Sequence, residues 1–373
     1  MDQRPDLLLA KRGGWIEILR VPALLFGGVA RARGAFYARG LLPSYDVGVP
    51  VISVGNLSAG GTGKTPMIVW LAKELASRKR KVGIVSRGYG SAAGAPNDEA
   101  LMLSEILPDV PHLQNPDRVA AATELGERGI DVVLVDDGFQ HRRLARDVDL
   151  VLMDATRPFG LPAMGDNGKP VQAMLPRGLM REPLSALKRA DAVVITRADA
   201  VPEETVRELE ALVQRHAPGC PVALAAHAPV RLRSVSSGGE RVRPVEDLAG
   251  LEVDLFSGIG NPAAFERTAS KLGAIIHSHR AFGDHHAFAP GDLDGLGVDR
   301  PALTTAKDAA RLLGANPGAE EDHGVCEVPP DLCVLDVELI VARGRSILEA
   351  LVDSLPESRA QRERAAIHEG LHG

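Results

Sequence analysis

The chain has few cysteines and no long hydrophobic run, and these two shortages exclude several classes of protein. Its 373 residues include Cys220, Cys326 and Cys333, which are too few and too unevenly spaced for a disulfide framework and form no C-x-x-C pair for zinc. Sparse thiols of this kind are typical of a reducing compartment. No segment reaches the ~20 uninterrupted apolar residues that a bilayer span needs. We therefore expect no disulfide scaffold, no zinc site and no transmembrane helix.

The chain as a whole also lacks an excess of positive charge, since 43 lysines and arginines stand against 49 aspartates and glutamates. The formal net charge is -6, which argues against a surface built to bind nucleic acid. The first 44 residues differ, because seven of them are basic and three are acidic. Their apolar stretch, WIEILRVPALLFGGVARARGAFY, is interrupted by Glu17, Arg20 and Pro22, and it lacks a small-residue cleavage site of the signal-peptide type.

This leader, residues 1–44, has two interpretations. It suits a helix that lies in a membrane surface with its arginines facing anionic headgroups. The apolar side would then carry Trp15, Leu19, Leu24, Leu25 and Phe26. The alternative is a helix that packs on its own domain, and the sequence leaves both open.

A glycine-rich stretch is the clearest chemical signal that is present. Residues 53–66 read SVGNLSAGGTGKTP, which differs from the phosphate-loop pattern G-x-x-x-x-G-K-[ST] only in Ser58 at the first glycine. The difference is tolerable because consecutive backbone N–H groups, a helix N-terminus and the lysine hold the anion. A β-branched run precedes the loop and a helical pattern follows it, as a phosphate loop requires. We therefore predict that a nucleotide's phosphates bind to Ser58, Ala59, Gly60, Gly61, Thr62, Gly63, Lys64 and Thr65.

An acidic pair follows another apolar run, in DVVLVDDGFQHRRL. It places Asp136 and Asp137 at the carboxyl end of a predicted strand, where open α/β sheets bind their ligands. Together with the Thr65 hydroxyl, these carboxylates are expected to hold a nucleotide-bound Mg²⁺ ion. Adjacent residues at the end of a strand point to opposite sides, so the sequence leaves open which aspartate contacts the metal.

From about residue 47, short apolar runs alternate with helical patterns, which is typical of a parallel α/β sheet. The predicted strands lie within 49–55, 81–88, 131–137, 149–155, 192–198 and 221–227, and then within 253–262, 274–282, 301–308 and 332–341. The charged, glycine-rich passage 234–250 between the two series is the expected domain boundary. We predict an α/β fold: a P-loop NTPase-type parallel-sheet domain with a second, smaller α/β domain and an N-terminal membrane-surface helix. The expected ranges are 1–44 for the leader, 45–232 for the nucleotide-binding domain, 233–345 for a smaller domain that closes over the site, and 346–373 for a C-terminal helix and polar tail.

Two further motifs could supply a general base. Asp98 opens a helical pattern, and His285 and His286 follow Asp284 after a predicted strand. A hydrogen-bonded carboxylate raises the basicity of an imidazole and fixes its tautomer. Spacing alone does not show that residues so far apart meet, and an N-cap for Asp98 and a surface turn for His285 are the structural alternatives.

Nine stretches, taken together and in order from about Trp15 to Val341, resemble the tetraacyldisaccharide 4'-kinase family of lipid A biosynthesis. They are GNLSAGGTGKTP, SRGYG, NDEALML, VDDGFQHRRL, LPRGLMREP, ADAVVITRAD, FSGIGNPAAFERTASKLGA, FGDHHAF and LTTAKDAARL. DDGFQH and GIGNP are far more specific than the phosphate loop alone.

The resemblance implies an ATP- and Mg²⁺-dependent transfer of the γ-phosphoryl group to the 4'-hydroxyl of a tetraacyldisaccharide 1-phosphate, which gives lipid IVA. It also implies a peripheral enzyme at the cytoplasmic face of a Gram-negative inner membrane, whose leader meets the anionic membrane surface and the acylated substrate. The family's catalytic acid and imidazole fall on Asp98 and His285, with His286 also open, and Asn97 stands where the family usually has glycine. We expect a monomer with no nucleic-acid partner.

Two nucleotide-binding alternatives differ from this chain at one position each. A ParA/MinD-like ATPase switch carries K-G-G-x-G-K-T, and Ala59 stands where its first lysine would be. A GTPase reads guanine with N-K-x-D, and in VITRAD the asparagine is replaced by Thr196. The chain therefore lacks the lysine that the ATPase switch needs and the asparagine that the GTPase needs, and the kinase is the preferred interpretation.

Overall fold

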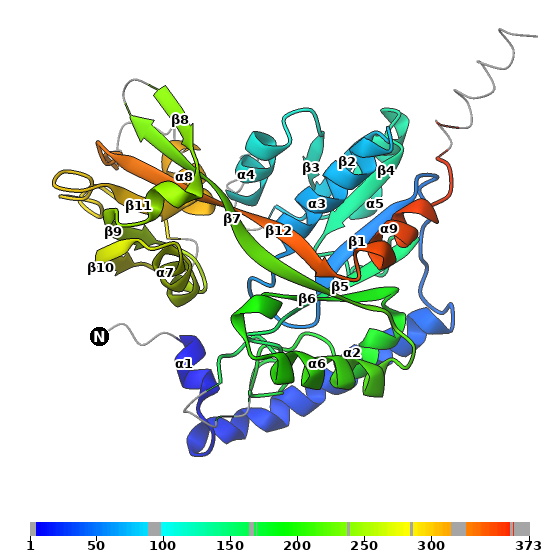
Figure 1. The fold of residues 1–373 in the computed structure, drawn as a ribbon. Coiled ribbons are helices and arrows are strands. Elements are labelled where there is room, and N and C mark those ends of the chain that lie inside the picture. Colours follow the sequence, from blue (N-terminus) through cyan, green and yellow to red (C-terminus); the bar gives the residue numbers. More distant parts are fainter. Residues whose placement is uncertain are drawn as a thin grey trace, which may run out of the picture. The chain divides into compact units, whose positions relative to one another are not determined.

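The computed structural model describes residues 5–88, 98–163, 168, 170–236, 239–283, 286–314, 326–358 and 361. The chain forms two compact units (Figure 1). The first consists of Met1–Tyr89, Leu107–Ala226 and Leu339–Gly373, and the second of Gly90–Ile106 and His227–Glu338. Compared with the expected ranges, residues 90–106 group with the second unit. Two of the crossings between the units lie within strands, one in β7 (Val222–Ser236) and one in β12 (Leu332–Arg343).

The first unit contains a parallel sheet in the order β7-β6-β5-β1-β4-β2-β3. Its strands are β1 (Val51–Asn56), β2 (Val82–Ser86), β3 (His112–Gln114), β4 (Val132–Asp136), β5 (Val148–Asp154), β6 (Ala192–Thr196) and the first part of β7 (Val222–Ser236). Strands buried on both faces read as continuous apolar runs, which is why the sequence predicts them. β3 was not predicted, because three half-buried residues are too few to show a pattern.

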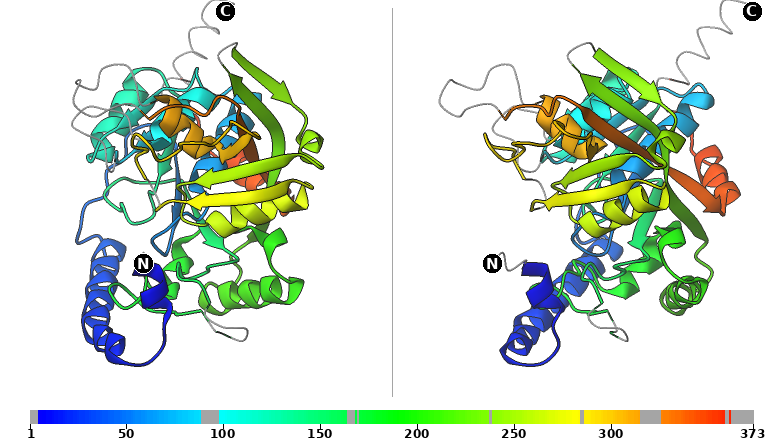
Figure 2. Two further views of the ribbon diagram at one scale, coloured as in Figure 1. Left: turned by 90° about the vertical axis from the view of Figure 1, so that its left-hand side faces the viewer. Right: turned by 60° about the vertical axis from the view of Figure 1, so that its left-hand side comes forward.

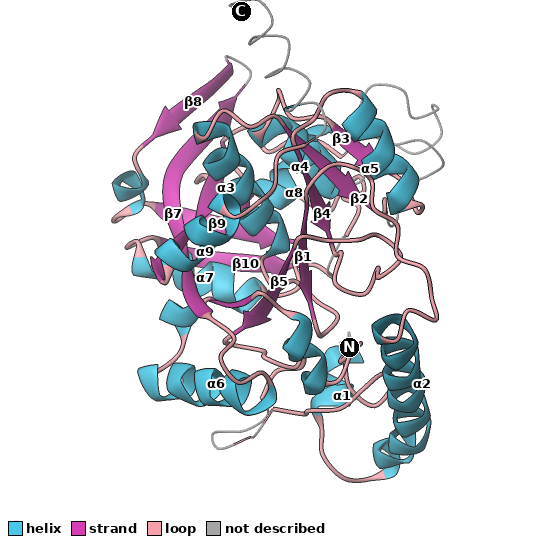
Figure 3. Ribbon diagram, turned by 90° about the vertical axis from the view of Figure 1, so that its right-hand side faces the viewer, coloured by secondary structure: helices cyan, strands magenta, loops and turns pink. Residues whose placement is uncertain are grey.

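Helices cover both faces of this sheet. Side chains alternate along a strand, so Val51, Val133 and Val135 share one face, where Ala121 and Leu125 of α5 (Arg118–Glu127) pack on them. The same face continues to α6 (Glu203–His216), which contributes Leu209 and Val213 to a cluster with Val151, Met153, Val193 and Ile195. The helix after the phosphate loop, α3 (Lys64–Ser77), packs on β1, β2 and β4 from the other face (Figure 3).

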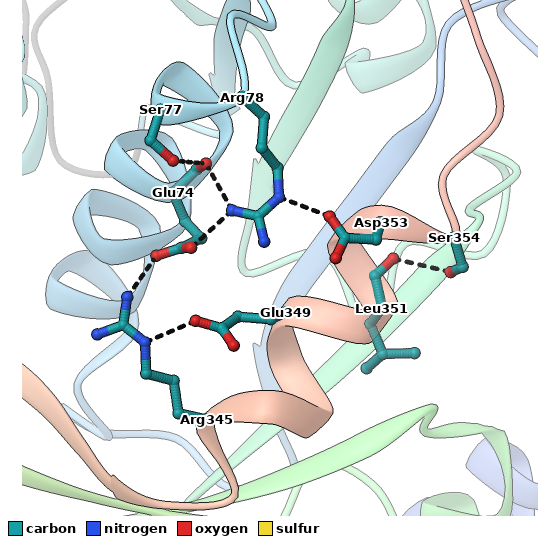
Figure 4. Close-up of polar contacts among 8 residues, drawn as sticks. All are labelled: Glu74, Ser77, Arg78, Arg345, Glu349, Leu351, Asp353 and Ser354. Atoms are coloured by element: carbon teal, nitrogen blue, oxygen red, sulfur yellow. Dashed lines mark hydrogen bonds and ion pairs between the residues drawn. The ribbon is translucent and has the colours of Figure 1, made fainter.

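The C-terminal helix α9 (Arg345–Asp353) is tied to α3 by ion pairs (Figure 4). Arg78 donates to Glu74 on its own helix and to Asp353, with both N–O distances at 2.6 Å. Arg345 donates to Glu74 at 3.0 Å and to Glu349 at 2.7 Å. Because charged networks with shared partners hold better than isolated surface pairs, α9 restrains the helix that begins at the phosphate loop.

The second unit contains a smaller sheet in the order β10-β9-β11-β12-β7-β8. Its strands are β8 (Gly239–Arg243), β9 (Glu252–Ser257), β10 (Ile275–Ala281), β11 (Ala302–Thr305), β12 (Leu332–Arg343) and the second part of β7. Its helices are α4 (Asp98–Ile106), α7 (Pro262–Lys271) and α8 (Ala306–Gly314), and α4 packs on α8. The ten predicted strands are all present, and the α/β fold class is confirmed.

The expected boundary over 234–250 is instead part of a β-hairpin. β7 and β8 pair antiparallel from Leu232 with Arg243 to Ser236 with Gly239, and the 3-10 helix η4 (Val245–Leu248) follows. Serine and glycine suit both a linker and a tight turn. The passage 234–250 lies within the second unit.

The leader folds as α1 (Pro5–Ala10), the 3-10 helix η1 (Trp15–Leu19) and the long helix α2 (Arg20–Ala38), which is the blue helix in Figure 2. It is tied to the first unit by polar contacts. The buried Arg177 guanidinium donates to the carbonyl oxygens of Leu9 and Lys11 at 2.8 Å each, and Arg142 donates to the Gly34 carbonyl at 2.7 Å. Packing on the domain is thus one of its roles.

Its outer side is apolar and exposed. The most exposed large apolar side chains of η1 and α2 are Trp15, Ile18, Val21, Leu24, Leu25 and Val29, which are 63–80% exposed. Hydrogen bonds from Arg177 and then Arg20 lower the pKa of Glu17 to about 2, so this carboxylate stays charged at the base of the helix. Within the part of the chain that the structure describes, no helix combines the length and the hydropathy that a membrane span requires.

Candidate active site

The phosphate loop links β1 to α3 in the first unit. Gly63 is the N-cap of α3 and has φ 88°, and Gly60 has φ 121°. Both angles lie in the region that favours glycine. An added Cβ at Gly60 or Gly61 would meet no atom within 4 Å, so the loop surface is open there. The loop therefore presents free backbone next to a helix N-terminus, which is the arrangement that binds phosphate.

Close packing of glycines sets the distance between this loop and the acidic pair. A Cβ at Gly55 would lie 2.5 Å from Cβ of Phe139, and one at Gly138 would lie 2.6 Å from Oγ of Ser53. Only glycine allows the turn after β4 to come so near β1. As a result Nζ of Lys64 lies 3.7 Å from Oδ1 of Asp137.

Asp137 is the most strongly engaged acid of the site. Both of its oxygens accept hydrogen bonds from the Arg181 guanidinium at 2.7 Å. Burial alone would raise the pKa of Asp137, but the Arg181 hydrogen bond and the charges of Lys64 and Arg181 outweigh it and hold this pKa well below its usual range. Its φ of 53° is unusual for a residue other than glycine, and such strained residues cluster at functional sites.

Asp136 is the last residue of β4 and is buried. Its carbonyl oxygen accepts a hydrogen bond from Nη2 of Arg118 at 3.3 Å. The carboxylates of Asp136 and Asp137 and the Thr65 hydroxyl are the hard oxygen donors that Mg²⁺ prefers. These residues fit such an ion, although Asp137 would have to share one oxygen between the metal and Arg181.

Arg181 and Asn56 are site residues that the sequence reasoning missed. Arg181 also donates to Oδ1 of Asn56, and the Asn56 amide donates to Oγ1 of Thr62 at 2.9 Å. A chain of hydrogen bonds therefore runs from Asp137 into the phosphate loop. Arg181 stands in LPRGLMREP, so the stretch that carried the resemblance contained the signal, but no spacing rule assigned the residue a role.

The residues predicted to form the general base belong to the second unit, and the structure describes only some of them. Asp98 is the first residue of α4, and its side chain lies outside the described part of the structure, as do Asp284 and His285. His286 is described. Its Nε2 lies 2.7 Å from Oδ2 of Asp292, and its ring stacks on Phe282 with a centroid distance of 4.6 Å.

The family model described as tetraacyldisaccharide-1-P 4'-kinase matches residues 15–355. A tetraacyldisaccharide 4'-kinase of Anaeromyxobacter dehalogenans strain 2CP-C is 40% identical over 371 residues, which is 93% of this chain and 92% of that protein. One from Halothermothrix orenii is 32% identical over 86% of this chain and 88% of its own length.

The chain belongs to the tetraacyldisaccharide-1-P 4'-kinase family. A solved structure of LpxK from Aquifex aeolicus in complex with ATP is similar, with 27% identity and a TM-score of 0.68 over 91% of this chain and 99% of that one. The predicted family is confirmed, and with it the enzyme class, an ATP-dependent lipid A disaccharide 4'-kinase. Family membership decides against the ATPase switch and the GTPase.

Proposed function

We propose that the phosphate loop, the acidic pair and an Asp98 and His285 base move the γ-phosphoryl group of ATP to the 4'-hydroxyl of a tetraacyldisaccharide 1-phosphate in this chain. The observation that carries the proposal is the approach of Lys64 to Asp137 at the carboxyl ends of neighbouring strands. A cation and a carboxylate placed there can serve the transferring group and its metal.

In the proposed reaction the loop amides and the Lys64 ammonium bind the β- and γ-phosphate oxygens. Asp136, Asp137 and the Thr65 hydroxyl would hold Mg²⁺, which when bound supplies neutralisation of the oxygen charge that develops during transfer. Asp98, oriented with His285, accepts the proton of the attacking hydroxyl, since an alcohol of high pKa needs a base.

An assay with γ-labelled ATP tests the function directly. The acceptor is a synthetic tetraacyldisaccharide 1-phosphate, and thin-layer separation should show label in a product that gains one phosphate. Label that appears only as inorganic phosphate would mean an ATPase. Replacing labelled ATP by labelled GTP in the same assay identifies the donor.

The Asp137→Asn variant should raise the Mg²⁺ concentration for half-maximal rate at least ~10-fold and also lower kcat, because an amide is a poorer magnesium ligand than a carboxylate. Asp136→Asn is the matched comparison and tells which aspartate matters more. Calorimetric titration of Mg²⁺ into the ATP complex gives a readout independent of turnover. An unchanged Mg²⁺ response in both variants would place the metal elsewhere.

We further propose that the enzyme is a monomer that binds peripherally to the anionic cytoplasmic face of the inner membrane through its leader. The exposed apolar side chains of η1 and α2 would enter the acyl boundary. Spanning is disfavoured because Glu17 and Arg20 would cost ~2.5–3.5 kcal/mol each at the bilayer centre. Arginines along the helix would add about 1 kcal/mol each near anionic lipid.

Changing Leu24, Leu25 and Val29 together to serine should release the protein from anionic vesicles and raise KM for the lipid while leaving KM for ATP unchanged. These side chains are 68–72% exposed, so the triple variant leaves the core intact. Val298→Ser removes an equally exposed valine, at 70%, and should change nothing. Retained vesicle binding by the triple variant would refute a membrane role for this face of α2.

A further inference from the structure

Three consecutive carbonyl oxygens of the phosphate loop, those of Gly60, Gly61 and Thr62, accept hydrogen bonds from protein donors. The Gly60 carbonyl accepts from the Thr62 N–H at 3.1 Å and more weakly from Nδ2 of Asn56 at 3.4 Å. The Gly61 carbonyl accepts from Nη1 of Arg197 at 3.0 Å, and the Thr62 carbonyl accepts from Oγ1 of Thr196 at 2.9 Å. Two of these four hydrogen bonds come from Thr196 and Arg197, at the carboxyl end of β6.

Those two residues are themselves firmly placed. Thr196 is fully buried, and Arg197 adopts φ 53°, a left-handed conformation that a residue with a side chain adopts only when its surroundings hold it there. Oδ2 of Asp154 pairs with Nη1 of Arg197. Oδ1 of the same carboxylate accepts from the backbone N–H and the hydroxyl of Thr156 at 2.9 and 2.7 Å, so Asp154 is fixed from both sides.

The direction of loop carbonyls matters for an anion. A peptide unit that turns its N–H toward a phosphate must turn its C=O away, and a carbonyl aimed at the phosphate would repel it. Donors that hold the carbonyls of Gly61 and Thr62 therefore fix the orientation of both peptide units. The first of these units keeps its Thr62 N–H on the Gly60 carbonyl, and the second fixes the direction of the Gly63 N–H. Such orientation before binding lowers the cost of ordering the loop around ATP.

We infer that Asp154, Thr196 and Arg197 form a loop brace, a set of positioning residues that fixes the phosphate loop in its ATP-binding conformation. The inference rests on the proposed role of that loop. It also gives VITRAD a function: the position where a guanine reader would have asparagine carries Thr196, whose hydroxyl is committed to the Thr62 carbonyl. The motif thus positions the loop that binds the phosphates and does not recognise the nucleotide's base.

Titration of ATP into the intact protein, without any lipid acceptor, tests the brace. Arg197→Ala should weaken ATP binding at least ~10-fold, as expected for loss of a hydrogen bond from a charged donor. Arg197→Lys should recover most of the affinity, because an ammonium can still reach a carbonyl and pair with Asp154. Thr196→Val, which keeps the shape and removes the hydroxyl, should weaken ATP binding by ~3–10-fold.

The comparison variant is Arg207→Ala, which should bind ATP normally. Arg207 pairs with Glu203 on the surface, and the two side chains are 70% and 77% exposed. A brace predicts that KM for ATP rises while KM for the lipid and the melting temperature of the ligand-free protein stay unchanged. Unchanged ATP affinity in both Arg197→Ala and Thr196→Val would overturn the inference, as would an equal loss for both substrates with a lower melting temperature. If Arg197→Ala does not fold, Thr196→Val and Arg197→Lys decide by the same criteria. A parent enzyme that binds ATP but does not phosphorylate the lipid would refute the proposed function and leave the brace standing.

Discussion

Replacing Lys64 by alanine is expected to lower kcat by at least ~100-fold, because a charge that contacts the transferring phosphoryl group acts mainly in the transition state. In free-energy terms this is about 2.7 kcal/mol or more of lost transition-state stabilisation. The fold should survive. Asp137 keeps its two hydrogen bonds from Arg181 when the lysine ammonium, 3.7 Å away, is removed.

Steady-state kinetics at saturating ATP measures this effect, with Lys73→Ala as the control. Lys73 is an exposed lysine on the same helix, so its removal changes the charge of α3 equally without touching the loop. Near-normal turnover of Lys64→Ala would refute the hypothesis that this loop binds the phosphates of ATP. A loss of the same size in Lys73→Ala would attribute the effect to overall charge instead.

The core of the fold could be predicted because buried parallel strands have a strong local signal. β4 and β6 are continuous runs of valine, leucine and isoleucine, and their ends place Asp136 and Thr196 at one edge of the sheet. The hairpin of β7 and β8 could not be predicted in this way. Its outer strand β8 is exposed and charged, so neither burial nor period distinguishes it from a linker.

The site was predictable where function requires a fixed residue type at a fixed spacing. The glycines and Lys64 of the loop are of this kind. Arg181 and Arg197 are not, because each reaches the site from a separate segment through a long side chain. Only the fold brings Arg181 to Asp137 and Arg197 to Gly61, and a sequence contains no local trace of such tertiary contacts.

The exposed face of α2 shows a further limit of predicting structure from a sequence pattern. The expected apolar side included Leu19 and Phe26, yet Ile18, Val21 and Val29 are more exposed than Phe26. A helix with apolar residues on several sides can bury one of them and expose another. Ala23 and Gly27 are the buried positions of α2, because small residues let the helix approach the domain closely. The surface of the domain therefore determines which side of α2 is buried.

Replacing the proposed base is expected to have the largest effect on turnover. Asp98→Ala and His285→Ala should each reduce kcat by ~10²–10⁴-fold, and the double variant should be little worse than the more damaged single one. A carboxylate that orients an imidazole, or is oriented by it, loses its function when either partner is removed, so the two losses overlap. Fully additive losses would mean that the two residues act independently.

His286→Ala is the matched control for this prediction, since two histidines stand side by side. The His286 ring lies against Phe282, its Nε2 is 2.7 Å from Asp292, and its carbonyl accepts a hydrogen bond from Arg311 at 3.1 Å. An imidazole held in this way serves the structure of its loop, so we expect the variant to lower kcat by less than about tenfold. The pH profile adds a second criterion: Asp98→Ala should abolish the acidic limb of kcat, because that limb reports protonation of the base, and His286→Ala should keep it. A His286→Ala enzyme as inactive as Asp98→Ala, beside an active His285→Ala, would transfer the proposed role to the second histidine.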